Sequence, residues 1–173
     1  MNYTKFYKIL VINNIMKHFF LERHCVYDKA TKGLNKEGFL QAMIMAQEIK
    51  RIADNYHNVV LISSPARRAQ ETIKPVAKIL GASYHIDSRL QPIDWRILSY
   101  QELCEIDDMI KPFMNNDIIV LTSHYEVLEP YPQHALKTLC DKHETIRLAD
   151  RGELWHLDLN TELYEFLPKR IKS

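Results

Sequence analysis

The sequence has almost no net charge, no closely spaced pair of cysteines and no hydrophobic run long enough to cross a membrane. The net charge of +1 gives no reason to expect nucleic acid or an anionic membrane as a partner. The three cysteines are widely spaced and odd in number, which argues against a disulfide framework and favours reduced thiols in the cytoplasm. Any attraction for an anion must therefore be local.

Repeats, linkers and low-complexity tracts are also missing from the 173 residues, a length typical of one domain. The apolar run at residues 9–12 is interrupted by Asn13 and Asn14, and no cleavage site of small residues follows it. We expect residues 1–15 to be an N-terminal extension, either an artefact of the assigned start codon or an added element beside the domain. Residues 16–173 are expected to form a single domain.

Apolar runs of strand type alternate with helical patterns over the first two-thirds of the chain. The expected strands are residues 19–21, 59–62, 83–86, 117–122, 145–148 and 153–158. The expected helices are residues 36–55, 64–80, 99–109 and 133–140. This alternation predicts an α/β fold, a three-layer α/β/α sandwich around a mostly parallel sheet. Ligands in such sheets bind at the carboxyl ends of the strands.

Polar motifs with arginine and histidine follow three of the expected strands. Arg23 and His24 follow the first strand, Arg68 follows the strand at 59–62, and His124 follows a later strand. Two guanidiniums and two imidazoles at one sheet edge would suit a tetrahedral dianion, because arginine presents a planar fork to phosphate oxygens. Histidine can act as a nucleophile or a base near neutral pH. The residues therefore predict phosphoryl transfer through a histidine.

These motifs resemble those of the histidine phosphatase superfamily, which has the phosphoglycerate mutase-like fold. The family patterns R-H-G, L-T-x-x-G, S-S-P-x-x-R-A and S-H correspond here to Arg23-His24-Cys25, Leu34 to Gly38, Ser63 to Ala69, and Ser123-His124. The match runs in order from residue 18 to about residue 159. In its compact form the chain is most similar to the short phosphohistidine phosphatases.

The resemblance implies a role for each matched residue. His24 would be the nucleophile that forms a covalent phosphohistidine, and Arg23, Arg68 and His124 would bind the phosphoryl oxygens. We expect His124 to be most useful as a protonated donor. No metal or other cofactor is needed in this scheme, because arginine and histidine supply the positive charge. Arg67 is expected on a solvated helix face or beside the entrance.

Two positions depart from the family pattern. Cys25 replaces the usual glycine, and we expect it to pack in the interior rather than to act as a reactive thiol. Pro92 stands where the family has a glutamate that serves as general acid. Asp94 and Glu126 are the candidate substitutes, although a surface position is the favoured interpretation for both.

The implied function is a metal-independent phosphatase that hydrolyses a phosphomonoester or a protein phosphohistidine. Loss of a general acid costs about 10²–10⁴ in rate for a poor leaving group, which favours aryl phosphates or phosphohistidine. The short loop from His24 to Leu34 leaves no room for a lid, and an open site favours a phosphoprotein over a small phosphorylated molecule. The alternative is a weak or inactive relative that binds a phosphorylated protein or an anion.

Overall fold

The computed structural model describes residues 16–91, 94 and 96–168. The expected extension at residues 1–15 and the Pro92 position lie outside the described residues. The strands are β1 (His18–Arg23), β2 (Val59–Ser63), β3 (Tyr84–Ile86), β4 (Ile118–Ser123), β5 (Leu154–Asp158) and β6 (Leu163–Leu167). The helices are α2 (Lys36–Ala53), α3 (Arg67–Leu80), α4 (Tyr100–Ile110), α5 (Tyr125–Leu128) and α6 (Tyr131–Cys140), with 3-10 turns η1 (Ser88–Leu90) and η2 (Lys111–Phe113). None of these helices has the length and apolar character that a bilayer crossing needs.

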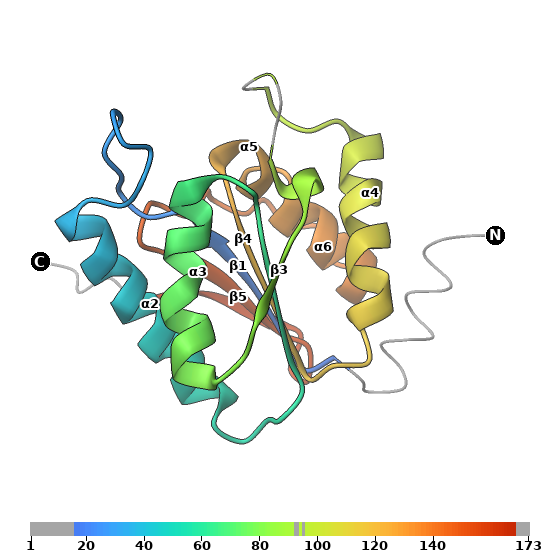
Figure 1. The fold of residues 1–173 in the computed structure, drawn as a ribbon. Helices are drawn as coiled ribbons and strands as arrows, with labels where there is room; N and C mark the ends of the chain where they lie inside the picture. Colours follow the sequence, from blue (N-terminus) through green and yellow to red (C-terminus); the bar gives the residue numbers. More distant parts are fainter. Residues whose placement is uncertain (1–15, 92–93, 95, 169–173) are drawn as a thin grey trace, which may run out of the picture.

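The described strands form one sheet in the order β3-β2-β4-β1-β5-β6 (Figure 1). Strand β4 pairs in parallel with both β1 and β2, and β3 pairs in parallel with β2. Strand β5 runs antiparallel to both of its neighbours, β1 and β6. The expected mostly parallel sheet is confirmed, and its parallel strands direct their carboxyl ends to the same edge.

Helices cover both faces of this sheet (Figure 1). Helices α2 and α3 lie on one face, and α4 and α6 lie on the other. Successive side chains of a strand point to opposite faces. In β4, Ile119 and Leu121 accordingly join the core that contains α4 and α6, whereas Val120 joins the core that contains α2 and α3. The expected three-layer arrangement is therefore confirmed.

Helix α2 begins where the sequence predicts it. The side chain of Asn35 caps the helix by accepting a hydrogen bond from the Gly38 backbone N–H at 2.9 Å. Gly38 packs so closely on the preceding loop that a Cβ atom there would lie 1.9 Å from the Val26 carbonyl oxygen. The glycine of the L-T-x-x-G-like motif thus fixes the helix against the loop that follows β1.

The predicted strand at residues 145–148 is wrong, and β6 was not predicted. In the 145–148 segment Ile146 packs into the core, while the guanidinium of Arg147 donates two 2.7 Å hydrogen bonds to Glu153. Alternating burial there comes from packing on the core and not from pairing in a sheet. The sequence does not predict the β5–β6 hairpin because its turn contains no glycine. Glu162 instead adopts the left-handed conformation in that turn, at φ 54°.

A pair of buried histidines joins β1 to β5. The His18 Nδ1 and His156 Nε2 atoms are 3.1 Å apart, and His18 Nε2 lies 3.0 Å from the Tyr56 hydroxyl. Phe20 stacks on the His156 ring with centroids 4.4 Å apart. Burial lowers the pKa of His18 and lowers the pKa of His156 to about 4, so both rings are neutral at pH 7.

We predict that the folded protein loses stability in mild acid partly through His156. In the unfolded chain this histidine takes up a proton near pH 6.5, whereas in the folded chain it does so only near pH 4. Its contribution is complete above pH 6.5 and falls as the pH drops towards 4. The loss from this one group is about 2 kcal/mol between pH 7.5 and pH 5. Urea unfolding at both pH values measures it.

The control for this prediction is His156→Phe, which keeps a ring against Phe20 but removes the titrating group. The variant should show a smaller drop in unfolding free energy between the two pH values than wild type. An unchanged drop would show that His156 is not responsible.

Candidate active site

The ends of three parallel strands bring the predicted site residues together. At the end of β1 the backbone N–H of His24 donates to the Ser123 carbonyl at 3.0 Å. At the end of β2 the N–H of Ser64 donates to the Thr122 carbonyl at 3.0 Å. His124 follows β4 directly, and its ring centroid lies 5.1 Å from that of His24. Residues 100 positions apart in sequence therefore share one sheet edge because β4 pairs with both other strands.

The His24 ring is held in one tautomer. Its Nδ1 atom lies 3.0 Å from the Cys25 carbonyl oxygen, which can only accept a hydrogen bond, so Nδ1 carries the proton. The Nε2 atom consequently has a free lone pair. Burial lowers the pKa of His24 to about 3, and the charges of Arg68 and Arg151 add to this effect. His24 is thus a neutral imidazole at pH 7, as a nucleophile must be.

The His124 ring is held in the opposite tautomer. An Arg68 Nη atom, which can only donate, lies 3.0 Å from His124 Nδ1, so Nδ1 accepts and Nε2 carries the proton. That N–H donates to the Ser64 hydroxyl at 2.7 Å. Burial lowers the pKa of His124 to about 3, with Arg68 and His24 contributing. In this arrangement the His124 ring is neutral because a guanidinium donates to its acceptor nitrogen, and the protonated donor expected for the transferring group stays a prediction.

Two guanidiniums in the site each have an N–H group without a hydrogen-bond acceptor among the described residues. Arg23 donates through one Nη atom to the Ala149 carbonyl at 3.2 Å, but its Nε atom is buried without a hydrogen-bond partner among the described residues. The Nε atom of Arg68 is in the same situation. Burial lowers the pKa of both guanidiniums, but arginine stays charged at neutral pH. Buried N–H groups of cations are costly without acceptors, and an oxyanion would supply them.

A third cation was missed by the sequence reasoning. Arg151 is exposed, and its guanidinium lies 5.4 Å from the Tyr27 ring centroid, while that of Arg68 lies 5.0 Å from the same ring. The charge of Arg151 lowers the pKa of Arg23, His24 and Arg68. No short-range pattern in the sequence marks Arg151 as a site residue, and the residue that follows it is a closely packed glycine. Gly152 has φ 78°, and a Cβ atom there would lie 2.6 Å from the Gln41 side chain.

Cys25 packs in the interior, as expected. The side chain is fully buried, and its backbone N–H donates to the Thr72 hydroxyl at 3.0 Å. Burial raises the pKa of the Cys25 thiol to about 12, which leaves it protonated and unreactive. The residue does not adopt a positive φ, so replacing glycine costs no backbone strain. The nearby Glu22 carboxyl is also buried, which raises its pKa to about 8, so it does not neutralise the site.

The two candidate acids occupy different environments. Asp94 is exposed, as expected, and its charge acts on Arg96. Glu126 is only 5% exposed, and its charge raises the pKa of both Arg23 and Arg68. The expected surface position is therefore wrong for Glu126. It lies in α5, a single helical turn directly after His124 whose residues 126–128 turn towards the interior.

Arg67 and Arg68 separate as expected. The side chain of Arg67 is 62% exposed, and its Nε donates to Glu71 at 2.7 Å. Glu71 in turn accepts a 2.6 Å hydrogen bond from the Leu34 backbone N–H. Arg67 thus holds the loop that follows β1, while Arg68 faces His124.

Comparison with known proteins identifies a family for the chain. The family model of the histidine phosphatase superfamily (branch 1) matches residues 21–118. No curated protein sequence matches the chain significantly.

Several solved structures share the fold. The candidate phosphohistidine phosphatase SixA from Agrobacterium tumefaciens aligns with a TM-score of 0.58 at 18% identity, covering 88% of this chain and 98% of its own. The α-ribazole phosphatase from Shigella flexneri aligns with a TM-score of 0.61 at 15% identity, covering 90% and 96%. The mycobacterial glucosyl-3-phosphoglycerate phosphatase in complex with VO3 aligns with a TM-score of 0.59 at 13% identity, covering 87% and 96%. At these identities the likeness concerns the fold.

We predict that both imidazoles stay neutral from pH 7.5 down to pH 5, with the proton on Nδ1 in His24 and on Nε2 in His124. Burial and the adjacent guanidiniums oppose a second proton on either ring. Long-range 1H–15N NMR distinguishes the two tautomers, and a urea-unfolded sample supplies the reference titration. A folded-state signal of either residue that titrates together with the unfolded reference would contradict the prediction.

Proposed function

The chain belongs to the histidine phosphatase superfamily (branch 1), and from that membership we propose that it is a phosphatase in which His24 accepts the phosphoryl group and passes it to water. The observation that carries the proposal is the state of His24. The ring is neutral, its Nδ1 proton is bound to the Cys25 carbonyl, and its Nε2 lone pair lies beside cations. Neither the mechanism nor the choice of nucleophile requires a metal ion.

In the first step Nε2 of His24 attacks phosphorus, the bond between phosphorus and the leaving group breaks, and the leaving group departs with the bonding electrons. The ring then carries both the phosphoryl group on Nε2 and the proton on Nδ1, so it is cationic. The Cys25 carbonyl stabilises that cation by accepting the Nδ1 proton's hydrogen bond. In the second step water attacks phosphorus, and His24 leaves as the neutral imidazole from which it began.

The cations position the phosphoryl group and neutralise its charge. The buried Nε atoms of Arg23 and Arg68 would donate to phosphoryl oxygens, and Arg151 would add charge from the rim of the site. A bound dianion favours the imidazolium form of His124, because an opposite charge stabilises the protonated ring. His124 would then donate from Nδ1 to the phosphoryl group in place of accepting from Arg68.

Glu126 is the proposed proton donor for poor leaving groups. It is buried beside Arg23 and Arg68, whereas Asp94 is exposed and acts on Arg96. It also follows His124 by two residues, so the same strand end positions both.

The proposed substrate class is a phosphoryl group carried by a protein, with phosphohistidine as the leading case. The loop after β1 is short and is held by its own hydrogen bonds. Asp28 accepts hydrogen bonds from the backbone N–H groups of Ala30 and Thr31 at 2.8 Å, and Tyr27 bridges to Leu34. A short loop that is tied down beside the site favours a protein side chain as the carrier of the phosphoryl group, and a phosphohistidine leaving group takes its proton readily from solvent.

We predict that wild-type protein hydrolyses an aryl phosphate, an alkyl phosphate and a phosphohistidine protein, and that His24→Ala lowers all three rates by roughly 10³-fold or more. Removing the nucleophile removes the covalent route for every substrate. Phosphate release measures the rates. His57→Ala, which removes an exposed imidazole before the start of β2, is the matched control and should retain activity.

The result that contradicts the proposal is equal inertness of wild type and His24→Ala on all three substrates. Retained binding of a phosphoprotein by such an inert protein would support the alternative, a relative that binds phosphorylated partners without hydrolysing them.

We predict that Glu126→Gln slows the alkyl phosphate by about 10²–10⁴ and leaves the aryl phosphate nearly unchanged, because only a poor leaving group needs the proton. Asp94→Asn, the control carboxylate in the exposed environment, should leave both rates unchanged. Steady-state kcat/KM values of wild type and both variants on the two substrates show whether Glu126 acts as the acid. An equal loss on both substrates would assign Glu126 to positioning Arg23 and Arg68, and no loss would exclude it as the acid.

A further inference from the structure

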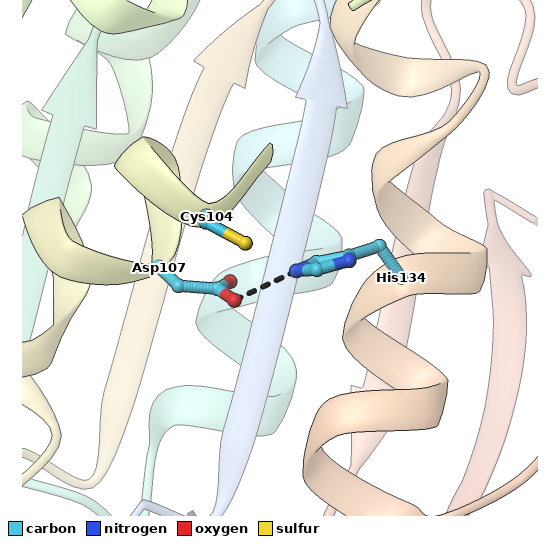
Figure 2. Close-up of side chains that lie close together, drawn as sticks. All are labelled: Cys104, Asp107 and His134. Atoms are coloured by element: carbon cyan, nitrogen blue, oxygen red, sulfur yellow. Dashed lines mark hydrogen bonds and ion pairs between the residues drawn. The ribbon is translucent and has the colours of Figure 1, made fainter. Parts of the chain in front are cut away.

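A second cluster of reactive side chains lies between α4 and α6 (Figure 2). Cys104 and Asp107 are three residues apart on α4, a spacing that puts both side chains on one face of the helix. His134 reaches them from α6. The proposed phosphatase chemistry uses none of these residues.

The three donor atoms converge on one point. A sulfur, a carboxylate oxygen and a ring nitrogen from these residues all lie within 4.8 Å of one another. The His134 Nε2 atom lies 2.7 Å from Asp107 Oδ2, and Figure 2 shows the Cys104 sulfur on the same side of the ring as the carboxylate. The other ring nitrogen points away from both. A relay from thiol through imidazole to carboxylate would place the two partners at different ring nitrogens, so this arrangement fits shared coordination and not a nucleophile.

The surroundings of the cluster also fit a metal site. The Tyr131 hydroxyl donates to Asp107 Oδ1 at 2.8 Å, which orients the carboxylate and leaves Oδ2 directed at His134. Such outer hydrogen bonds are typical of metal-binding carboxylates. Asp107 and His134 are 7% and 8% exposed, whereas Cys104 is half-buried. The ligand positions are therefore held by packing on the core.

A path for the ion is present. A cavity of about 510 Å³ opens beside the cluster and is lined by His134 and Tyr100, whose side chain is largely exposed. The cavity also carries one acidic and several basic side chains, among them Glu144 and Lys137, so it is not strongly charged in either sense. Of the three cluster residues His134 lines this cavity, so an ion bound at His134 would lie next to water in the cavity.

From these observations we propose that Cys104, Asp107 and His134 bind one Zn²⁺ ion, with water as the fourth ligand. Thiolate, imidazole and carboxylate are the ligands that zinc takes in proteins, and the thiolate disfavours Mg²⁺ and Ca²⁺. On binding, the Cys104 thiol releases its proton, and His134 Nε2 gives up the proton that it shares with Asp107. Tetrahedral coordination needs donors about 3.3–3.6 Å apart, so the Nε2–Oδ2 pair opens by less than about 1 Å. The ion would link α4 to α6.

The test uses full-length protein freed of metal with a chelator and then titrated with Co²⁺, which takes zinc-type sites and reports thiolate ligation by a near-ultraviolet charge-transfer band. We expect one equivalent of Co²⁺ to produce the band, Zn²⁺ to displace it, and Zn²⁺ to raise the melting temperature. Cys104→Ser should abolish the band, and Cys140→Ser, which removes a half-buried thiol from α6, should retain it. Tyr131→Phe should weaken binding by about tenfold or more.

The proposal is overturned if wild type shows no thiolate band, or if the band survives in Cys104→Ser or disappears in Cys140→Ser. Circular dichroism and phosphatase activity in chelator show whether each variant is folded. Should Cys104→Ser fail to fold, Cys104→Ala serves the same purpose with a smaller side chain.

Discussion

The parallel pairing of β4 with both β1 and β2 is the constraint on which the rest of the structure depends. Register places Arg23 opposite Ser123 and Ser63 opposite Thr122, so the residues that follow all three strands emerge at one level. A shift of one residue in the pairing of β4 with β1 or β2 would turn the alternating side chains of the shifted strand to the opposite face of the sheet and disrupt the packing of both cores. The apolar residues of the strands thus fix the position of His24 beside His124. Packing of the core therefore sets the geometry of the candidate site.

Burial and like charge determine the protonation state of the site. Both histidines are kept neutral by desolvation and by neighbouring guanidiniums, and the buried Glu22 carboxyl does not offset the cations because it too is neutral at pH 7. Among the described residues the charge of Glu126 acts on Arg23 and Arg68, but the buried Nε atoms of both guanidiniums have no hydrogen-bond partner. Unpartnered N–H groups are unfavourable for folding and favourable for binding a dianion. The hydrogen bonds to the Cys25 carbonyl and from Arg68 set opposite tautomers in the His24 and His124 rings. Because of this difference, His24 can attack phosphorus, whereas His124 can hold the phosphoryl group.

Much of the fold and of the candidate site follows from the sequence because both depend on local patterns. Continuous apolar runs predicted β2 and β4, and polar motifs at their ends predicted the meeting of His24, Arg68 and His124. The β6 hairpin and the burial of Glu126 depend on a glycine-free turn and on the path of α5, which carry no short-range signal. Arg151 and the Cys104, Asp107 and His134 cluster depend on contacts between distant segments.

The most direct test of the central claim is to trap the phosphoenzyme with a phosphoramidate donor and to determine which nitrogen of which histidine carries phosphorus. Mass spectrometry under alkaline conditions locates the residue, and 31P NMR distinguishes the two ring positions. We predict phosphorus on Nε2 of His24, because the Nδ1 proton is hydrogen-bonded to the Cys25 carbonyl. Phosphorylation at Nδ1, or at any residue other than His24, would contradict it.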